Sequence, residues 1–205
     1  MVLSGFDYSE IPIPDNNDRA KSIYGNVTEI IPEDAPRPLG PRVIMTTYVD
    51  ANLCHDMVTG RAVTGILHLL NQTPVDFYTK KQSTVETATY GSEFVAGRTA
   101  TEQIIDLRLT LRYLGVRIEG GTYMFGDNKT VVDSSMSIAS RLHKRHIILS
   151  YHRVREAIAA RVLYFIHLPG ALNPADILSK AWGYQQVWIM LKALLFWEGD
   201  TIDIE

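Results

Sequence analysis

The chain has 205 residues, a length that predicts one domain or one domain with an extension. Hydrophobic residues make up 46% and charged residues 21%, which is ordinary for a globular protein and excludes a wholly disordered chain. The net charge of −3 argues against a protein whose whole surface binds nucleic acid, but it permits a local basic patch.

The first 41 residues differ from the rest in proline content and in charge. They contain six of the nine prolines, and seven acidic residues against three basic ones. Proline at this density excludes a helix or a central strand across residues 32–41. We interpret 1–41 as an extended, proline-rich acidic connector, and we expect it to be ordered only where apolar anchors dock. These anchors are Ile11, Ile13, Tyr24, Val27, Ile30 and Ile31.

Three β-strands are predicted next, over residues 43–50, 63–70 and 75–81. They are rich in β-branched and aromatic residues, and the short turn at 71–74 joins the last two as a hairpin. We therefore expect the three strands to form an antiparallel meander.

Helices and strands alternate in the remainder. From Ser92 the apolar residues follow a helical period as far as Gly115, a candidate C-cap. Further strands are predicted at 122–127 and 162–167, and helices at 131–140, 147–160, after Pro174 and at 184–197. This order predicts an α/β fold: a five-stranded mixed sheet, its first three strands antiparallel, flanked by helices. We place the domain at 42–182 and a C-terminal amphipathic helix or tail at 183–205.

Four carboxylates fall where strands end or helices begin. Asp50 and Asp127 close the first and fourth strands, and Glu93 and Asp176 lie near the starts of two helices. If those strands are neighbours, the carboxylates converge, and their repulsion is costly unless cations lie between them. All-oxygen ligands select Mg²⁺ or Mn²⁺, and two such ions suit attack on a phosphodiester. Taken singly, each acid is as well explained as a turn former or a helix cap.

Five blocks of sequence carry a resemblance to a known family. They are YVDANLCHDMVTGRAVTG (48–65), KKQSTVETATYGSEFVA (80–96), GDN (126–128), KRHIILSYHRVRE (144–156) and NPADILSK (173–180). In the same order they resemble blocks of the ribonuclease H domain of copia-type retrotransposon polyproteins. Residues 24–43 are similar to the segment that links the polymerase to this domain, so the resemblance covers residues 24–182.

The resemblance implies the ribonuclease H fold and places the family's metal-binding and catalytic carboxylates on Asp50, Glu93, Asp127 and Asp176. The second block reads Lys-x-Gln-x-x-Val-Ala-Leu-Ser-Ser-Thr-Glu-Ala-Glu-Tyr-x-Ala in many relatives. Gly91 takes the place of its first glutamate, and Glu93 aligns with the second, catalytic one. We interpret Glu86 as an acid outside the site, at a loop or strand edge.

A second departure concerns a histidine that some members carry in a mobile loop before the fourth carboxylate. The corresponding stretch, 168–172, has no histidine. We interpret His167, at the end of the fifth strand, as a structural residue. Product release would then lack that group, which affects the rate of the reaction rather than its type.

Basic residues gather between positions 141 and 161, where Glu156 is the only acid. We predict phosphate contacts from Lys144, Arg145 and Arg153, although a solvated helix face explains this cluster equally well. Nucleic-acid contacts are also predicted for Lys80, Lys81, Gln82 and Asn128, the last two reaching bases or sugars. His143 and His146 have no third ligand at a fitting spacing, so we exclude zinc.

The leading hypothesis is a metal-dependent endoribonuclease that hydrolyses the RNA strand of RNA–DNA hybrids during reverse transcription, using two Mg²⁺ or Mn²⁺ ions. An upstream reverse transcriptase domain, or another polypeptide, is the expected protein partner. One alternative is a domesticated or fragmentary domain that serves as a binding or structural subunit. Another is a different nuclease, or an integrase, on the same fold.

The expected location is intracellular, in the cytoplasm or the nucleus. No apolar run approaches the roughly 20 residues of a membrane span, and the first ten residues do not resemble a signal peptide. The single cysteine, Cys54, excludes an internal disulfide and favours a reducing compartment. We therefore expect no membrane partner.

Overall fold

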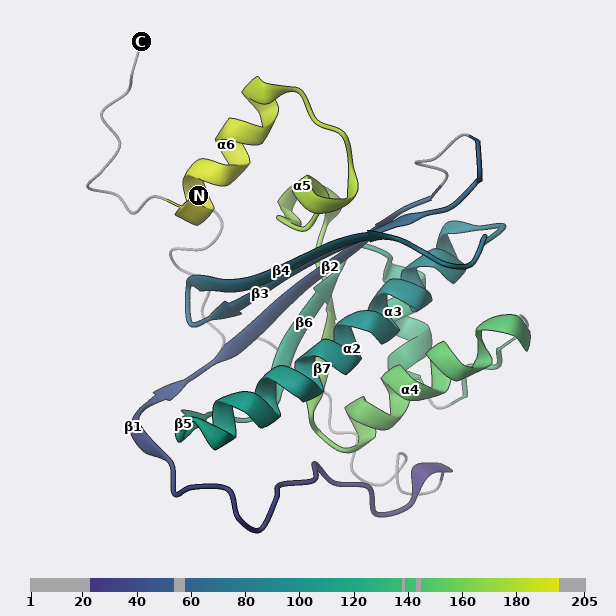
Figure 1. Ribbon diagram of the computed structural model, residues 1–205. Coiled ribbons are helices and arrows are strands. Elements are labelled where there is room, and N and C mark those ends of the chain that lie inside the picture. The colour runs from purple at the N-terminus through teal and green to yellow at the C-terminus, as the bar shows by residue number, and fades with distance from the viewer. Residues whose placement is uncertain (1–22, 54–57, 138, 143–144, 196–205) are drawn as a thin grey trace.

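A five-stranded mixed sheet forms the centre of the computed structural model, which describes residues 23–53, 58–137, 139–142 and 145–195 (Figure 1). The strand order is β4-β3-β2-β6-β7. The strands are β2 (Met45–Asn52), β3 (Val63–Leu70), β4 (Thr73–Lys81), β6 (Thr122–Gly126) and β7 (Leu163–His167). β2, β3 and β4 are antiparallel neighbours, whereas β6 and β7 run parallel to β2. The predicted mixed sheet with an antiparallel first half is confirmed.

Helices cover both faces of this sheet (Figure 1). One face carries α2 (Thr89–Tyr113), α3 (Lys129–Met136) and α4 (Ile148–Ala159), the last preceded by the 3₁₀ turn η2 (Arg145–Ile147). The other face carries α5 (Asp176–Ser179) and α6 (Tyr184–Leu195). A short 3₁₀ turn, η3 (Gly170–Leu172), connects β7 to α5. The long helix begins at Thr89, three residues before the predicted start at Ser92.

The main core lies between α2, α4 and the sheet. The apolar stripe predicted for α2 supplies Ala96, Ala100 and Ile104, each fully buried. α4 packs against this helix, and a Cβ at Gly97 would make an ordinary contact of 3.8 Å with Val154 of α4. Burying each large apolar side chain in this core contributes about 1.5–3 kcal/mol to the free energy of unfolding. The stripe ends before Leu114, which is mostly exposed at the helix C-terminus.

A second, two-stranded parallel sheet was not predicted. It pairs β1 (Leu39–Val43) with β5 (Val116–Ile118). Proline lacks the N–H that a ladder needs, so Pro41 argued against a strand at this position. The pairing is irregular between Leu39 and Arg42, and this irregularity accommodates Pro41 in an edge strand.

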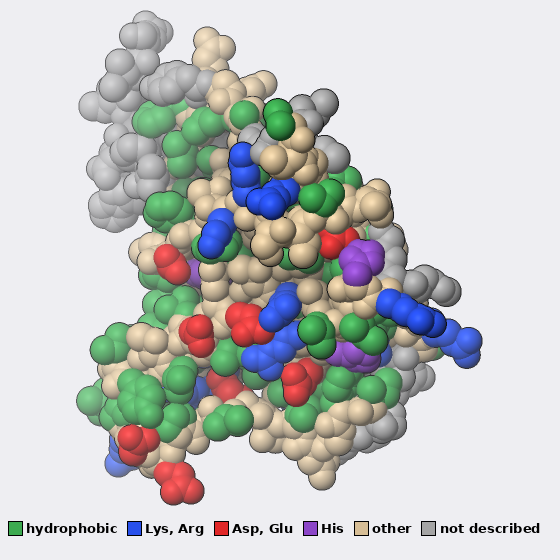
Figure 2. Space-filling view, turned by 45° about the vertical axis from the view of Figure 1, so that its right-hand side comes forward, with side chains coloured by type: hydrophobic (Ala, Val, Ile, Leu, Met, Phe, Trp, Pro, Cys, Tyr) green, Lys and Arg blue, Asp and Glu red, His purple; other side chains and the backbone are tan. Residues whose placement is uncertain are grey.

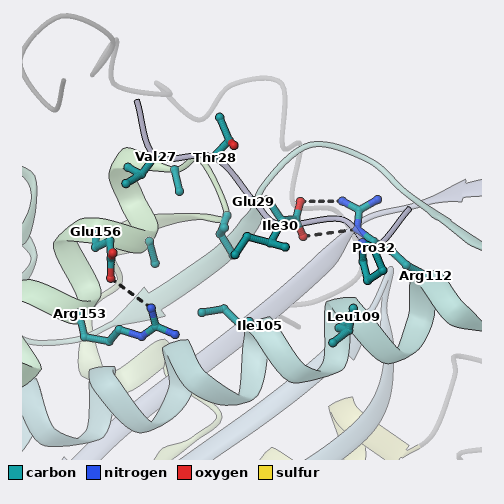
Figure 3. A pocket seen from close by; sticks show the side chains of 13 residues that line it. Val27, Thr28, Glu29, Ile30, Pro32, Ile105, Leu109, Arg112, Arg153 and Glu156 are labelled. Carbon is teal, nitrogen blue, oxygen red and sulfur yellow. Dashed lines mark hydrogen bonds and ion pairs between the residues drawn. The ribbon is translucent and has the colours of Figure 1, made fainter. Parts of the chain in front are cut away.

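An ion pair holds residues 24–38, here called the strap, against the domain (Figure 3). Glu29 accepts hydrogen bonds from Arg108 Nε at 2.7 Å and from Arg112 Nη2 at 2.6 Å. The side chain of Arg108 is only 2% exposed, and it also donates to Thr122 Oγ1 and to the Gly120 carbonyl. Burial raises the pKa of Glu29, but the two arginines lower it by more, so the pKa lies below its usual value.

The apolar residues of the connector dock less than expected. Tyr24 hydrogen-bonds to His152 Nδ1 and accepts from Arg155, and Val27 lines a cavity of about 430 Å³ between the strap and helices α2 and α4. In contrast, Ile30 is 88% exposed and Ile31 53%. The other two anchors, Ile11 and Ile13, lie outside the described residues.

The position of the domain boundary at Arg42 stays a prediction. That boundary separates Glu29 from the two arginines with which it pairs. These contacts favour an earlier start for the folded unit, near Tyr24. In the part of the chain that the structure describes, no helix is long and apolar enough to cross a membrane.

Replacing Glu29 with alanine is predicted to lower the free energy of unfolding by about 3–5 kcal/mol, because it leaves the buried Arg108 guanidinium without its counter-charge. The control is Glu33→Ala, at an exposed acid of the same strap, which is predicted to have almost no effect. Deleting residues 1–23 is likewise predicted to leave stability nearly unchanged. Chemical denaturation of the three variants measures these differences, and equal losses for the two glutamates would contradict the role given to Glu29.

Candidate active site

Two of the predicted carboxylates lie side by side because of the strand pairing. β2 and β6 are parallel neighbours in which Val49 pairs with Gly126. Asp50 and Asp127 follow these residues, so both carboxylates emerge at the same end of the sheet. Figure 2 looks toward this end and shows acidic and basic side chains side by side near the centre of the face.

The third aspartate, Asp176, reaches this end from the loop after β7. The buried side chain of Asn173 donates to the Val49 carbonyl at 2.9 Å and accepts from the Ala175 N–H at 3.1 Å. This amide therefore ties the loop to β2, immediately before Asp50. Asp176 begins α5 three residues later in the chain, where a carboxylate also suits the helix N-terminus.

Gly65 allows α5 to lie directly on the sheet. It pairs with Asp50 across β2 and β3. A Cβ at this position would lie 2.7 Å from the Ala175 carbonyl oxygen and 3.0 Å from the backbone nitrogen of Ser179. Because both atoms belong to the backbone, they cannot move aside cheaply. Any larger residue at position 65 would push Asp176 away from Asp50.

Together these elements bring three carboxylates into one cluster. Oxygen atoms of Asp50, Asp127 and Asp176 all lie within 4.8 Å of one another. Asp50 is 1% exposed and Asp176 6%, whereas Asp127 is half-buried. Three carboxylate oxygens this close are able to share a divalent cation.

Glu93, the fourth predicted ligand, lies beside this cluster on the second turn of α2. It is 8% exposed, and the Ala51 backbone N–H hydrogen-bonds to its carboxylate. This bond joins α2 to the strand that carries Asp50. The charges of Asp50 and Asp127 act on Glu93 directly. Glu93 thus lies close enough to Asp50 and Asp127 to be affected by their charge, and its role as a fourth ligand stays a prediction.

Burial and mutual repulsion raise the pKa values of this group. Burial has the largest effect on Asp50, whose pKa rises to about 6 with the neighbouring charge of Asp176 adding to it. Burial and the charges of Asp50 and Asp127 raise the pKa of Glu93 well above its usual range. Burial also raises the pKa of Asp127. A cation among these groups would favour their ionised forms.

Two further residues of the site, Ser179 and Lys180, were missed. Lys180 Nζ lies 2.5 Å from Asp176 Oδ1 and 3.8 Å from Asp50 Oδ2, and Ser179 Oγ donates to Asp50 Oδ2. Burial lowers the pKa of Lys180, but the bond to Asp176 and the charges of the other aspartates raise it by more. Both residues close the block NPADILSK. Their spacing of three and four from Asp176 on a helix was the signal that could have found them.

The charges of the site fit divalent metal ions. Among the described residues, Lys180 is the one lysine or arginine that pairs with these carboxylates, so their ionised forms carry more negative charge than it balances. Carboxylate oxygens are the ligands that Mg²⁺ and Mn²⁺ prefer. Asp50, Glu93, Asp127 and Asp176 are the residues that could hold such ions.

Of the predicted nucleic-acid contacts, Lys80 and Lys81 lie at the end of β4, two strands from the strand that carries Asp50. With Thr79, Ser179 and Lys180 they line an open hollow of about 310 Å³. Both lysines are exposed at the end of β4. Three lysines around one hollow make a surface that suits a phosphate.

Gln82 does not face nucleic acid, which corrects the prediction. Its side chain is 4% exposed, and its Nε2 donates to Thr64 Oγ1 at 3.0 Å and to the Ser92 carbonyl at 2.8 Å. Gln82 instead ties the end of β4 to β3 and to α2, one residue before Glu93. The pattern of polar residues near Glu93 could not distinguish this internal tether from a surface contact.

Asn128 and the basic residues of 141–161 also have structural partners. Asn128 caps α3, its Oδ1 accepting from the Val131 N–H. Arg153 pairs with Glu102 and Glu156. Arg155 is 5% exposed and donates to the carbonyls of 134 and 137.

The basic cluster is therefore not a single phosphate-binding surface. Arg145 is exposed on η2, so it retains the access that its predicted contact needs. Lys144 lies outside the described residues. The residue pattern did not reveal that Arg153 pairs with Glu102 on another helix, α2, in addition to Glu156 on its own helix.

Two residues interpreted as non-catalytic lie outside the cluster. His167 is exposed, and its Nε2 lies 3.1 Å from the Asp127 carbonyl oxygen, which suits the structural role predicted for it. Glu86 pairs with His146 rather than with the aspartates. Glu86 lies in a loop as expected, but its carboxylate is buried, which was not predicted.

Comparison with known structures settles the fold. The chain matches ribonuclease H1 from the archaeon Halobacterium salinarum with a TM-score of 0.51 and 18% identity, covering 68% of this chain and 95% of that one. It matches LC11-RNase H1, isolated from compost and determined in complex with an RNA/DNA hybrid, with a TM-score of 0.52 and 16% identity over 66% and 93% of the two chains. The chain has the ribonuclease H fold.

A sequence relative agrees with this assignment. The chain is 26% identical over 141 residues to a retrovirus-related Pol polyprotein from the transposon TNT 1-94 of Nicotiana tabacum. That match covers 69% of this chain and 10% of the polyprotein, so the chain spans only a small part of its relative's length. No family model matches the chain. The resemblance to the ribonuclease H domain of a copia-type retrotransposon polyprotein is confirmed.

The metal-free chain is predicted to become more stable as the pH falls from about 7 to about 5, because the folded chain binds protons there that the unfolded chain has already lost. The pKa of Asp50 is about 6 when folded, against an ordinary value of 3.8. Thermal melts across this range in a metal chelator measure the effect. Millimolar Mg²⁺ is predicted to raise the melting temperature at pH 7 and to reduce the pH dependence. A chelated protein that loses stability between pH 7 and pH 6 would contradict the account.

Proposed function

We propose that the chain is a metal-dependent endoribonuclease that hydrolyses the RNA strand of RNA–DNA hybrids. The observation that carries this proposal is the cluster of Asp50, Asp127 and Asp176, whose oxygens lie within 4.8 Å of one another on a ribonuclease H fold. Glu93 lies beside that cluster as a fourth carboxylate. Structural roles alone would not account for so many mutually repelling acids at one end of a sheet.

The four carboxylates would hold two Mg²⁺ or Mn²⁺ ions, which supply activation of a water molecule and stabilisation of the leaving 3′-oxygen. Asp50, at the end of the central strand, faces both Asp127 and Asp176. It would therefore be able to act as a ligand for both ions. Ser179 orients the Asp50 carboxylate through its hydrogen bond. Lys180 balances part of the charge on Asp176 and faces the hollow where a phosphate would lie.

The proposed substrate is a hybrid, bound with a backbone phosphate in the hollow formed by Lys80, Lys81 and Lys180. Lys180, which lines the hollow, also pairs with Asp176 and lies 3.8 Å from Asp50, so a phosphate held there would bring the neighbouring phosphodiester toward these two aspartates. The similarity of the fold to LC11-RNase H1, determined with an RNA/DNA hybrid, supports this choice.

The proposed biological setting is the reverse transcription of a retrotransposon. The tobacco relative is a Pol polyprotein much longer than this chain. A reverse transcriptase domain, encoded upstream or on another polypeptide, is accordingly the proposed protein partner. Such a partner would supply the hybrids on which this site acts.

The purified chain is predicted to cut the RNA of a labelled hybrid in millimolar Mg²⁺ or Mn²⁺, and to spare single-stranded and duplex DNA. Asp127→Asn is predicted to abolish cleavage and leave the fold intact, because it removes charge while keeping volume. If the chain binds the hybrid but never cuts it in Mn²⁺, this result would contradict the proposed nuclease activity. It would favour the alternative of a domesticated binding subunit.

Hybrid binding is predicted to weaken with salt through the lysines of the hollow. Lys80→Ala/Lys81→Ala should reduce the slope of log affinity against log salt by about 1–2, since each phosphate contact releases about one counterion. The matched control is Arg153→Ala, whose side chain is already paired with two glutamates and should leave the slope unchanged. If Arg153→Ala flattens the slope and the lysine variant does not, the phosphate lies on α4 instead.

A further inference from the structure

Lys180 lies near two of the clustered carboxylates at once. Its Nζ is 2.5 Å from Asp176 Oδ1 and 3.8 Å from Asp50 Oδ2. The side chains of these aspartates are only 8% and 2% exposed, so water weakens their attraction to the ammonium group little. A divalent ion bound by both carboxylates would be repelled by the same ammonium group, because the two cations would share their partners.

The side chain of Lys180 also reaches the hollow beside the carboxylates. It lines this hollow together with Lys80 and Lys81, and it is 34% exposed. The aspartates attract the ammonium group of Lys180, whereas the other two lysines repel it from the hollow. A phosphate in the hollow would change this balance, because it offers the ammonium group a second negative partner.

The backbone around Lys180 is held in place, while its side chain has room to move. Thr79 Oγ1 donates to the Leu178 carbonyl at 2.5 Å. Trp182 Nε1 donates to the Asp176 carbonyl at 2.9 Å, and the N–H of Lys180 donates to the same carbonyl at 3.1 Å. The lysine stem is a flexible chain of four carbons. The ammonium group is therefore able to change partner without any movement of α5.

We propose that Lys180 competes with divalent ions for Asp50 and Asp176, and that a phosphate in the hollow relieves this competition. The proposal rests on the proposed function, because it takes the two aspartates as metal ligands. Lys180 offsets the charge of the carboxylates until ions bind, and it then becomes available to a phosphate of the substrate. Metal binding and phosphate binding therefore strengthen each other, as linkage requires when both favour the same position of one side chain.

Calorimetry with Mn²⁺ measures the competition. Lys180→Met removes the charge and keeps a long side chain, so it is expected to bind Mn²⁺ about tenfold more tightly than the wild type, a typical size for coupled binding. Lys180→Arg is expected to bind Mn²⁺ no more tightly than the wild type, since a guanidinium is able to bind a carboxylate through two N–H groups. The matched control is Lys80→Met, which removes a charge from the same hollow and is expected to leave the affinity for Mn²⁺ nearly unchanged.

Two measurements on the wild-type chain complete the test. An ion pair slows the exchange of ammonium protons with water, so Lys180 should give a nitrogen–proton NMR signal in a chelator and lose it in millimolar Mg²⁺. Lys180→Arg, which keeps the charge and therefore protects folding, identifies this signal by its absence. Sulfate, added at constant ionic strength, is the probe for the hollow. It is expected to tighten Mn²⁺ binding to the wild type but not to Lys180→Met.

The outcomes separate this proposal from the proposed function. Lys180→Met binding Mn²⁺ no more tightly than the wild type, or a Lys180 signal that persists while ions bind, would overturn the competition. Sulfate without effect on the wild type would overturn the link to the hollow. A wild type that binds Mn²⁺ and releases Lys180 but cuts no hybrid would contradict the proposed function alone. A wild type that binds no divalent ion would contradict both.

Discussion

Repulsion among buried carboxylates is the constraint on which the rest of the structure depends. Asp50, Asp127 and Asp176 lie within 4.8 Å of one another, and Glu93 is buried beside them. Burial raises the pKa values of Asp50, Glu93 and Asp127. In the absence of cations, the ionised forms of these carboxylates are therefore disfavoured at this end of the sheet. The surrounding contacts have to hold the group together against that repulsion.

Each carboxylate is held by backbone geometry rather than by other side-chain charges alone. Strand pairing places Asp50 beside Asp127, and Gly65 lets α5 lie on the sheet with Asp176 at its start. On the opposite face, the Ala51 backbone N–H hydrogen-bonds to Glu93. At Gly65 the absence of a Cβ is required, because the atoms that a Cβ would meet belong to the backbone.

The sequence predicted the mixed sheet with its first three strands antiparallel, and it placed Asp50 and Asp127 at strand ends, because hydrophobic period and strand ends are local properties. It could not predict pairings between distant segments. Glu29 meets Arg108 across 79 residues, which turned part of an expected connector into a contact of the domain. Gln82 looked like a surface group because the burial of its side chain between β3 and α2 depends on tertiary packing. Arg153 pairs with Glu102 of α2, which lies 51 residues away in sequence. The spacing of Lys180 from Asp176 indicates that the two could pair on a helix. That Lys180 also lies near Asp50 depends on how close α5 lies to β2, which the sequence does not indicate.

The most direct test of this account is a crystal structure of the chain grown with Mn²⁺, using anomalous scattering to locate the ions. Two peaks about 4 Å apart are expected between Asp50, Glu93, Asp127 and Asp176. The Asp127→Asn variant, prepared in the same way, should lose at least one of them. Anomalous density only at surface acids, with Lys180 still bonded to Asp176, would contradict the central claim that these carboxylates form a metal site.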